Sequence, residues 1–499
     1  MITFITSLAL LVLGYVLYGA FVDRVFGSDK CRKTPCYTSG DGIDYIPMPT
    51  WKVFLIQFLN IAGTGPIFGA IQGILFGPAA YFWIVLGCVL GGAVHDYMSG
   101  MISLRKNGAS LPEIIGDELG GKARLMLRIM SLVLMILVGA VFATTPAGLL
   151  SNMIGGDSFF GDKTLWVIVI FAYYILATLL PIDKLIGKIY PVFGVALLIM
   201  AVGVCYGIFA YDGTMPEITE AFTNHHPSSA IPIFPGLCIT IACGAVSGFH
   251  ATQSPMMARC LKNEKHGRPI FYGAMITEGV VALVWAAAAI KFADSFDVTK
   301  FGMSNDIAPY EKLLAIMTNG GETSPNPAVL VNTICQSWLG TAGAVLAVLG
   351  VVAAPITSGD TAFRCARLIA ADFMHFAQDK IYKRLMLSLP IFVLSGVLMF
   401  VNFDILWRYF AWFNQSLSVF TLWAITVWLD KKAIKESKNG LSYLLSMIPA
   451  IWMTLVCVTY ILVAPNEGFG LDINISLGIA SLVALLFIVL FYYKRKRRI

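Results

Sequence analysis

Several ionisable side chains lie inside stretches that are otherwise apolar enough to cross a membrane. They are His95, Asp96, His250, Glu278, Asp360, Arg364, Asp404 and Arg408. Charged groups at membrane depth cost free energy, so they usually pair with one another or mark a path for ions or substrates. Glu278 would carry a coupling proton or be a partnered core carboxylate. His250 would contact substrate, sense pH or bond to backbone, and Asp360 with Arg364 has the spacing of a local ion pair on one helix.

A second group of polar residues occurs in the stretch AAPITSGDTAFR, residues 353–364. The hydroxyls of Thr357 and Ser358 lie one helical turn from the carbonyl of Ala354, which gathers oxygen atoms on one side of a helix. Together with backbone carbonyls near Ala62, these oxygens would form a site for a small hard cation such as Na⁺. The alternative is that both hydroxyls bond back to carbonyls of the preceding turn.

Other motifs give weaker signals of chemistry. Cys31 and Cys36 lie in a basic loop and amount to half a zinc site at most. The pair His95–Asp96 has no further catalytic partners nearby in the sequence, so we do not expect an enzyme. The stretch GTGPIFG, residues 63–69, lacks the spacing and the lysine of a phosphate-binding loop.

Composition identifies the protein class. The chain has 499 residues, of which 58% are hydrophobic and 13% charged, and its mean hydropathy is +0.77. These values predict an all-α polytopic membrane protein with about thirteen transmembrane helices. The predicted spans are 3–22, 51–77, 79–104, 123–149, 164–181, 186–210, 231–256, 268–291, 331–358, 384–401, 404–429, 442–464 and 472–493.

Lysine and arginine alternate between successive loops. The loops around 104–108, 183–188, 259–268, 364–385 and 430–438 and the tail 494–498 are basic, whereas 211–229 has no Lys or Arg. Because cytoplasmic loops carry the positive excess, we expect the N-terminus outside and the C-terminus in the cytoplasm. The basic tail is then a topology signal, and no nucleic-acid partner is expected.

Two spans contain helix-breaking stretches at matching positions. NIAGTGPIFG, residues 60–69, interrupts the second span, and CGAVSGFHATQSP, residues 243–255, interrupts the seventh. Breaks five spans apart fit two inverted repeats, 51–210 and 231–429, with 1–50 as an N-terminal addition and 442–499 as two C-terminal helices. The alternative for the first break is close helix packing through small residues.

Unwound backbone in a membrane survives where it lines a cavity, because its N–H and C=O groups need partners. We therefore expect a small-molecule site at the two breaks. The predicted substrate-binding residues are Gly63, Thr64, Gly65, Ser247, Gly248, His250, Thr252, Gln253 and Asn414. The predicted cation-coupling residues are Ala62, Ala354, Thr357, Ser358, Asp360 and Glu278, with Thr357 and Ser358 as Na⁺ ligands.

Six blocks of the sequence occur together in a specific order. They are DGIDYIP (41–47), IAGTGPI (61–67), GAVHDYMSGMISLRKNGASL (92–111), FPGLCITIACGAVSGFHATQS (234–254), YGAMITEGVVAL (272–283) and ITSGDTAFRCARLIAADF (356–373). With these blocks the chain resembles the carbon-starvation (CstA) family of bacterial peptide and pyruvate transporters. The chain has the length of the shorter members. It departs from the longer ones at Ile56 and Gln57, where they have two histidines.

The resemblance implies an inner-membrane secondary transporter with a LeuT-like 5+5 inverted-repeat core and discontinuous helices 2 and 7. It would take up peptides, amino acids or pyruvate during nutrient limitation, driven by Na⁺ or H⁺, with no other cofactor. In sodium symporters of that fold, hydroxyls at the place of Thr357 and Ser358 bind Na⁺. The alternative function is a membrane nutrient sensor of the same fold that binds ligand without net transport.

Overall fold

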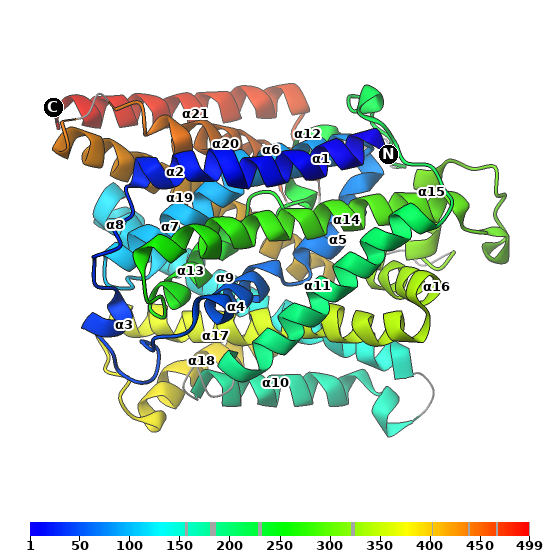
Figure 1. Cartoon of the computed structure of the whole chain (residues 1–499), viewed down its shortest axis with the longest axis horizontal. Helices are drawn as coiled ribbons and strands as arrows, with labels where there is room; N and C mark the ends of the chain where they lie inside the picture. The colour runs from blue at the N-terminus through cyan, green and yellow to red at the C-terminus, as the bar shows by residue number, and fades with distance from the viewer. Residues whose placement is uncertain are drawn as a thin grey trace.

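The protein is a bundle of helices that run mostly along the long axis of the molecule (Figure 1). The computed structural model describes residues 1–154, 158–179, 186–227, 232–320, 325–401, 403–437, 440–465 and 468–498. Within these residues every regular element is a helix, which confirms the predicted all-helical class.

The elements follow one another as a series of long helices joined by short connections. Their bounds are α1 Ile2–Leu13, α2 Gly19–Phe26, α3 Pro35–Thr38, α4 Thr50–Ala62, α5 Gly65–Gly73, α6 Ala79–Leu86, α7 Ala93–Arg105, α8 Leu111–Leu119, α9 Gly121–Ile154, α10 Lys163–Leu179, α11 Ile186–Ala210, α12 Ile233–Thr240, α13 Gly248–Ala258, α14 Gly273–Ser295, α15 Pro309–Met317, α16 Pro327–Ala347, α17 Ala353–Met374, α18 Ile381–Leu398, α19 Phe403–Lys435, α20 Leu444–Val463 and α21 Ile473–Lys496. Short π-helical turns join α1 to α2, α6 to α7 and α16 to α17.

The number of membrane-length helices is consistent with a multi-pass membrane protein. Among the described residues, nine helices are long and apolar enough to cross a bilayer, and the bent pair α4–α5 makes a tenth. α10 has 17 residues, and α12 and α13 are two short helices separated by unwound chain. The count of about thirteen spans therefore stays a prediction.

The ninth predicted span, 331–358, has the wrong boundaries. Helix α16 bends at Gly340, whose φ of 60° and ψ of −149° are not helical, and a continuous membrane-length helix runs from Val345 to Met374. The hydropathy signal ends early because α17 carries buried polar residues in its middle. Asp360 and Arg364 thus lie well inside a helix, and the predicted loop 364–385 shrinks to the connection 375–380 between α17 and α18.

The helices on either side of the two breaks pack against several other helices of the bundle. At the first break, α4 packs on α11, and both α4 and α5 pack on α14. At the second break, α13 packs on α19 and on α7. At the centre α9 packs on α17, where the phenyl ring of Phe363 fills the space beside Gly139. α10 then contacts α17, and α18 contacts α9.

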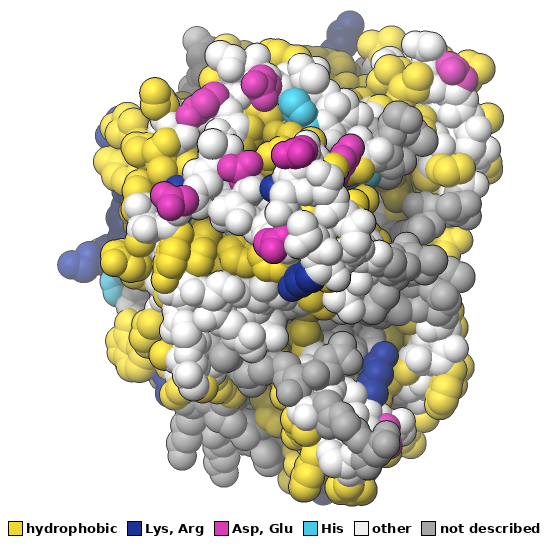
Figure 2. Space-filling model, turned by 90° about the vertical axis from the view of Figure 1, so that its right-hand side faces the viewer, with side chains coloured by type: hydrophobic (Ala, Val, Ile, Leu, Met, Phe, Trp, Pro, Cys, Tyr) yellow, Lys and Arg dark blue, Asp and Glu magenta, His cyan; other side chains and the backbone are white. Residues whose placement is uncertain are grey.

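The two ends of the bundle differ in charge. α8 lies at the left end in Figure 1, with the C-terminus, and α15 lies at the right end, with the N-terminus. Figure 2 shows the right end, where Asp and Glu side chains gather and few Lys or Arg side chains are visible. The connection 211–227 and residues 294–311 are rich in acidic side chains that are at least partly exposed: Asp212, Glu217, Glu220, Asp294, Asp297, Asp306 and Glu311.

The connection between α2 and α4 is anchored to α17 by a buried carboxylate. Asp44 Oδ1 lies 2.9 Å from Arg364 Nη1, and Asp44 Oδ2 lies 3.0 Å from Arg367 Nη2. Arg364 also donates to the Ala177 carbonyl at the end of α10. Burial by itself would raise the pKa of Asp44, but the Arg367 and Arg364 guanidinium groups outweigh burial and lower this pKa to about 2.

Replacing Asp44 should destabilise the protein strongly. Asp44→Asn leaves two buried guanidinium groups without their counter-charge, which should lower the free energy of unfolding by about 3–5 kcal/mol. The measurement is the thermal unfolding midpoint in detergent at neutral pH. In wild type the stabilisation from Asp44 is present above the unfolded pKa of roughly 4 and lost as pH falls through the folded pKa.

The matched control is Asp379→Asn. Asp379 pairs with Lys383 on the exposed first turn of α18 at 2.7 Å, and an exposed pair contributes less than about 1 kcal/mol. An unfolding midpoint for Asp44→Asn equal to that of the control would contradict the anchoring role.

Candidate functional site

The two helix breaks lie against each other in the interior. α4 ends at Ala62 and α5 starts at Gly65, with a bend of 45° between them. The turn requires glycine, since Gly63 has a φ of 38° and ψ of −145°. A Cβ atom on Gly65 would lie 2.4 Å from the Cβ and Sγ atoms of Cys243. The first break therefore crosses the unwound segment 241–247 between α12 and α13 at this glycine.

An asparagine from another helix holds the start of α13. The Asn414 side-chain oxygen accepts from the Phe249 backbone N–H at 2.6 Å and from the Ser247 hydroxyl at 3.1 Å. The backbone of α19 approaches so closely that a Cβ on Gly248 would lie 2.3 Å from the Asn414 carbonyl. Three predicted binding residues, Ser247, Gly248 and Asn414, are thus brought together.

A chain of buried ionisable groups runs beside the second break. His95 Nδ1 lies 2.8 Å from Asp96 Oδ1, and His250 Nδ1 lies 2.9 Å from Asp96 Oδ2. On the other side of its ring, His250 Nε2 lies 3.5 Å from Glu278 Oε2. All four side chains are fully buried and come from α7, α13 and α14. The sequence singled out each residue, and only the tertiary structure shows that they form one network.

The predicted cation ligands divide into two kinds. The Thr357 hydroxyl donates to the Ala354 carbonyl at 2.8 Å, as the back-bonding alternative required. The Ser358 hydroxyl instead crosses to α4 and donates to the Leu59 carbonyl at 2.9 Å. It also lies 3.5 Å from the position of a Cβ on Gly63. Ser358 is therefore the hydroxyl that meets the first break.

Three other predicted residues have different surroundings. Asp360 accepts a hydrogen bond from the Tyr173 hydroxyl of α10 at 2.9 Å. The Thr252 hydroxyl donates to the Phe249 carbonyl. Gln253 bonds to Thr252 and accepts from the Cys365 thiol of α17. These side chains contact α9, α10 and α17 and are not bonded to the His250 network.

The sequence interpretation missed two polar side chains of α4 that lie within two turns of the break, Gln57 and Asn60. Both are fully buried, as is the predicted binding residue Thr64 in the break itself. Both side-chain polar atoms of Asn60 and the Thr64 hydroxyl have no hydrogen-bond partner among the described residues, and Gln57 donates to the Ser254 hydroxyl of α13 at 3.4 Å. Amide side chains in an apolar run are a sequence signal of helix contacts or of a cavity, so they could have been singled out.

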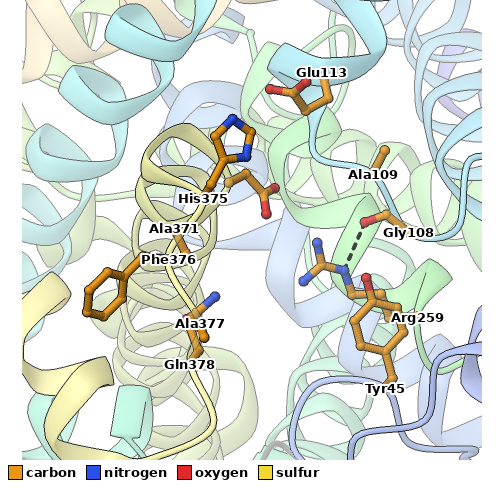
Figure 3. A pocket seen from close by; sticks show the side chains of 11 residues that line it. Tyr45, Gly108, Ala109, Glu113, Arg259, Ala371, His375, Phe376, Ala377 and Gln378 are labelled. Atoms are coloured by element: carbon orange, nitrogen blue, oxygen red, sulfur yellow. Dashed lines mark hydrogen bonds between the residues drawn. The ribbon is translucent and has the colours of Figure 1, made fainter.

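A pocket of about 600 Å³ opens at the end of the bundle that carries α8. Figure 3 shows Tyr45 and Arg259 on one side of it, His375, Phe376 and Gln378 on the other, and Glu113 above. Arg259 is buried and donates to the Gly108 carbonyl at 2.9 Å. Arg259 follows α13 directly, and Ala371 and Asp372 belong to α17. Both helices therefore run from the breaks to this pocket.

Cys31 and Cys36 form no candidate metal cluster in the described part of the chain. Cys31 is exposed and Cys36 is buried, and the Cys36 thiol donates to the Leu261 carbonyl.

Comparison with known proteins identifies the family. The family described as "Carbon starvation protein CstA" matches residues 1–156 and 146–460, which together cover most of the chain. The chain belongs to the carbon-starvation (CstA) family. The resemblance of the six sequence blocks is thereby confirmed.

Several curated relatives resemble the chain over 341 to 346 residues. An "Uncharacterized membrane protein" of Haemophilus influenzae is 44% identical over 59% of this chain and 92% of its own length. "Peptide transporter CstA" of Campylobacter jejuni is 32% identical over 56% of this chain and 48% of its own. "Pyruvate/proton symporter BtsT" of Escherichia coli is 30% identical over 57% of this chain and 48% of its own. The chain thus spans about half the length of these two named transporters.

The close contact of the two breaks at Gly65 and Cys243 can be tested by adding a side chain at position 65. Gly65→Ala places a methyl group where Cys243 already lies, and overpacking of this kind costs about 1–3 kcal/mol. We expect a lower thermal unfolding midpoint in detergent. Gly396→Ala in α18 is the matched control, because a Cβ there meets nothing within 4 Å and Ala stabilises a helix interior by about 0.5–1 kcal/mol relative to Gly. A stable Gly65→Ala protein would show that the breaks do not cross this tightly.

Proposed function

We propose that this member of the carbon-starvation family is a secondary active transporter that works by alternating access. It takes up peptides, amino acids or small carboxylates such as pyruvate, driven by a Na⁺ or H⁺ gradient. One observation carries the proposal: two discontinuous helices meet at Gly65 and Cys243 amid fully buried polar side chains. Discontinuous helices of this kind form substrate sites in transporters near the bilayer midplane.

The inverted repeat rests on corresponding helix contacts. If 51–210 and 231–429 are equivalent units, α4–α5 corresponds to α12–α13, α7 to α14, α9 to α17, α10 to α18 and α11 to α19. The contacts of α4 with α11, α14 with α4, and α10 with α17 then have their counterparts in α13 with α19, α7 with α13, and α18 with α9. The short helices α8 and α15, which follow α7 and α14, lie at opposite ends of the bundle (Figure 1), as an inverted relation requires.

The substrate's carboxylate would bind near the N-terminus of α5, where the backbone N–H groups and the positive end of the helix dipole favour an anion. The side-chain polar atoms of Asn60 and Thr64, which have no hydrogen bond to the described residues, would supply further polar contacts, and Ser247 and Asn414 would hold the facing start of α13. The coupling cation would lie between the carbonyls of the first break and the Ser358 hydroxyl.

The different charges of the two ends of the bundle support an orientation of the protein in the membrane. The end that carries α8 and the C-terminus bears the basic tail, and the opposite end is acidic (Figure 2). With the basic end in the cytoplasm, the pocket beside Arg259 lies on the side where an imported substrate leaves.

The test is uptake by the purified protein in proteoliposomes. Labelled pyruvate, amino acids and dipeptides are offered under an imposed Na⁺ gradient and, separately, an imposed H⁺ gradient. We expect accumulation of at least one substrate above its external concentration under one of the two gradients. Saturable binding without accumulation under either gradient would contradict transport and favour a nutrient sensor.

Ser358→Ala tests the cation site in the same vesicles. Loss of one ligand should raise the cation concentration needed for half-maximal uptake about tenfold, equivalent to about 1.4 kcal/mol. Ser395→Ala is the control, since its buried hydroxyl donates to the Ile136 carbonyl on α9, away from the breaks. Unchanged dependence on both Na⁺ and pH in Ser358→Ala would exclude Ser358 as a ligand.

A further inference from the structure

Three side chains beside the second break are arranged as metal ligands. They are Cys243 in the unwound segment 241–247, His250 on α13 and Glu278 on α14. One ligand atom from each, the thiol sulfur, an imidazole nitrogen and a carboxylate oxygen, lies within 4.8 Å of the other two. All three residues are buried. A thiol, an imidazole and a carboxylate together are a ligand set that suits zinc and related divalent ions.

The three ligand atoms differ in their hydrogen bonds, and the Cys243 thiol donates to the Ser247 hydroxyl at 3.7 Å. His250 Nε2 and both carboxylate oxygens of Glu278 have none among the described residues. Burial of carboxylate oxygens without a hydrogen-bond partner costs several kcal/mol or more, and a cation bound between these atoms would offset that cost.

The other ring nitrogen of His250, Nδ1, already has the kind of partner that a metal-binding histidine needs. Asp96 binds the Nδ1 side of the His250 ring at 2.9 Å, which directs Nε2 toward Glu278 and Cys243. A histidine that binds a metal usually bonds through its other ring nitrogen to a carboxylate in this way, and the carboxylate raises its basicity.

The distance between His250 and Glu278 fits two ligands of one metal ion better than a direct hydrogen bond between them. His250 Nε2 and Glu278 Oε2 are 3.5 Å apart, which is long for a hydrogen bond. Two ligands about 2.0–2.2 Å from a tetrahedral zinc ion lie about 3.3–3.5 Å from each other. The Cys243 sulfur, which lies within 4.8 Å of the other two ligand atoms, would have to approach further on binding.

The charges of the buried groups also favour a bound cation at this place. Asp96 and Glu278 bring two carboxylates into the interior, and their ion-pair partners in the described part of the chain are His95 and His250. A neutral His250 that binds a divalent ion would balance these carboxylates without requiring an imidazolium at membrane depth.

We propose that Cys243, His250 and Glu278 bind one divalent transition-metal ion of the zinc class, with Asp96 orienting the histidine. The ion joins the unwound segment to α13 and α14 and leaves one tetrahedral position open. This site is distinct from the Na⁺ or H⁺ site proposed at Ser358, and it does not depend on whether the protein transports.

The first experiment measures metal content. Wild type, Cys243→Ala, Glu278→Gln and the control Cys88→Ala are purified in detergent, incubated with ZnCl₂, washed by gel filtration and analysed by elemental mass spectrometry on the monodisperse peak. Cys88 is a suitable control because its buried thiol donates to the Met275 carbonyl and lies outside the cluster. We expect about one ion per chain in wild type and Cys88→Ala and at least a fivefold loss in the two ligand variants.

A second measurement decides the matter if a ligand variant does not fold. Wild type loaded with Co²⁺ should show a thiolate-to-cobalt charge-transfer band, which Cys88→Ala keeps and Zn²⁺ displaces. Wild type with less than a tenth of an ion per chain and without this band would overturn the site. Equal metal content in wild type and both ligand variants would show binding elsewhere and would also overturn it. Because neither readout involves uptake, failure of the metal site is distinguishable from failure of the transport proposal.

Discussion

The structure depends on how backbone and side-chain polar groups find partners where two helices are broken inside an apolar bundle. A continuous helix satisfies its own N–H and C=O groups, but the turn at Gly63–Thr64 and the segment 241–247 do not. Neighbouring helices therefore have to supply the partners. Asn414 from α19 does so at the start of α13, and Ser358 from α17 does so beside the end of α4.

Close approach of the backbones makes this arrangement possible. Gly65 and Gly248 have no side chain where Cys243 and α19 lie against them, so the two breaks and their supporting helices come within hydrogen-bonding distance. These glycines, each the first residue of the helix after a break, thus allow the contacts that compensate for the interruption.

Buried charge imposes a second, related constraint. Asp44 neutralises two arginines of α17, and the His250 network gathers two carboxylates and two histidines beside the second break. α13 and α17 each connect the breaks to the pocket beside Arg259. A movement of either helix would therefore change the surroundings of the buried polar groups and of the pocket together.

The sequence by itself determined the all-helical membrane class and the position of both breaks, since these follow from local hydropathy and from glycine and proline, and the resemblance of its six blocks indicated the family. It failed at the boundaries of α17, because the polar residues around Asp360 and Arg364 resemble a loop until their distant partners are known. It also missed Asn60 and the anchor at Asp44. Only the tertiary structure decided which polar residues meet: His250 with Asp96 and Glu278, and Ser358 with α4. The reason is that each partner lies on another helix, more than twenty residues away, and local sequence carries no record of that pairing.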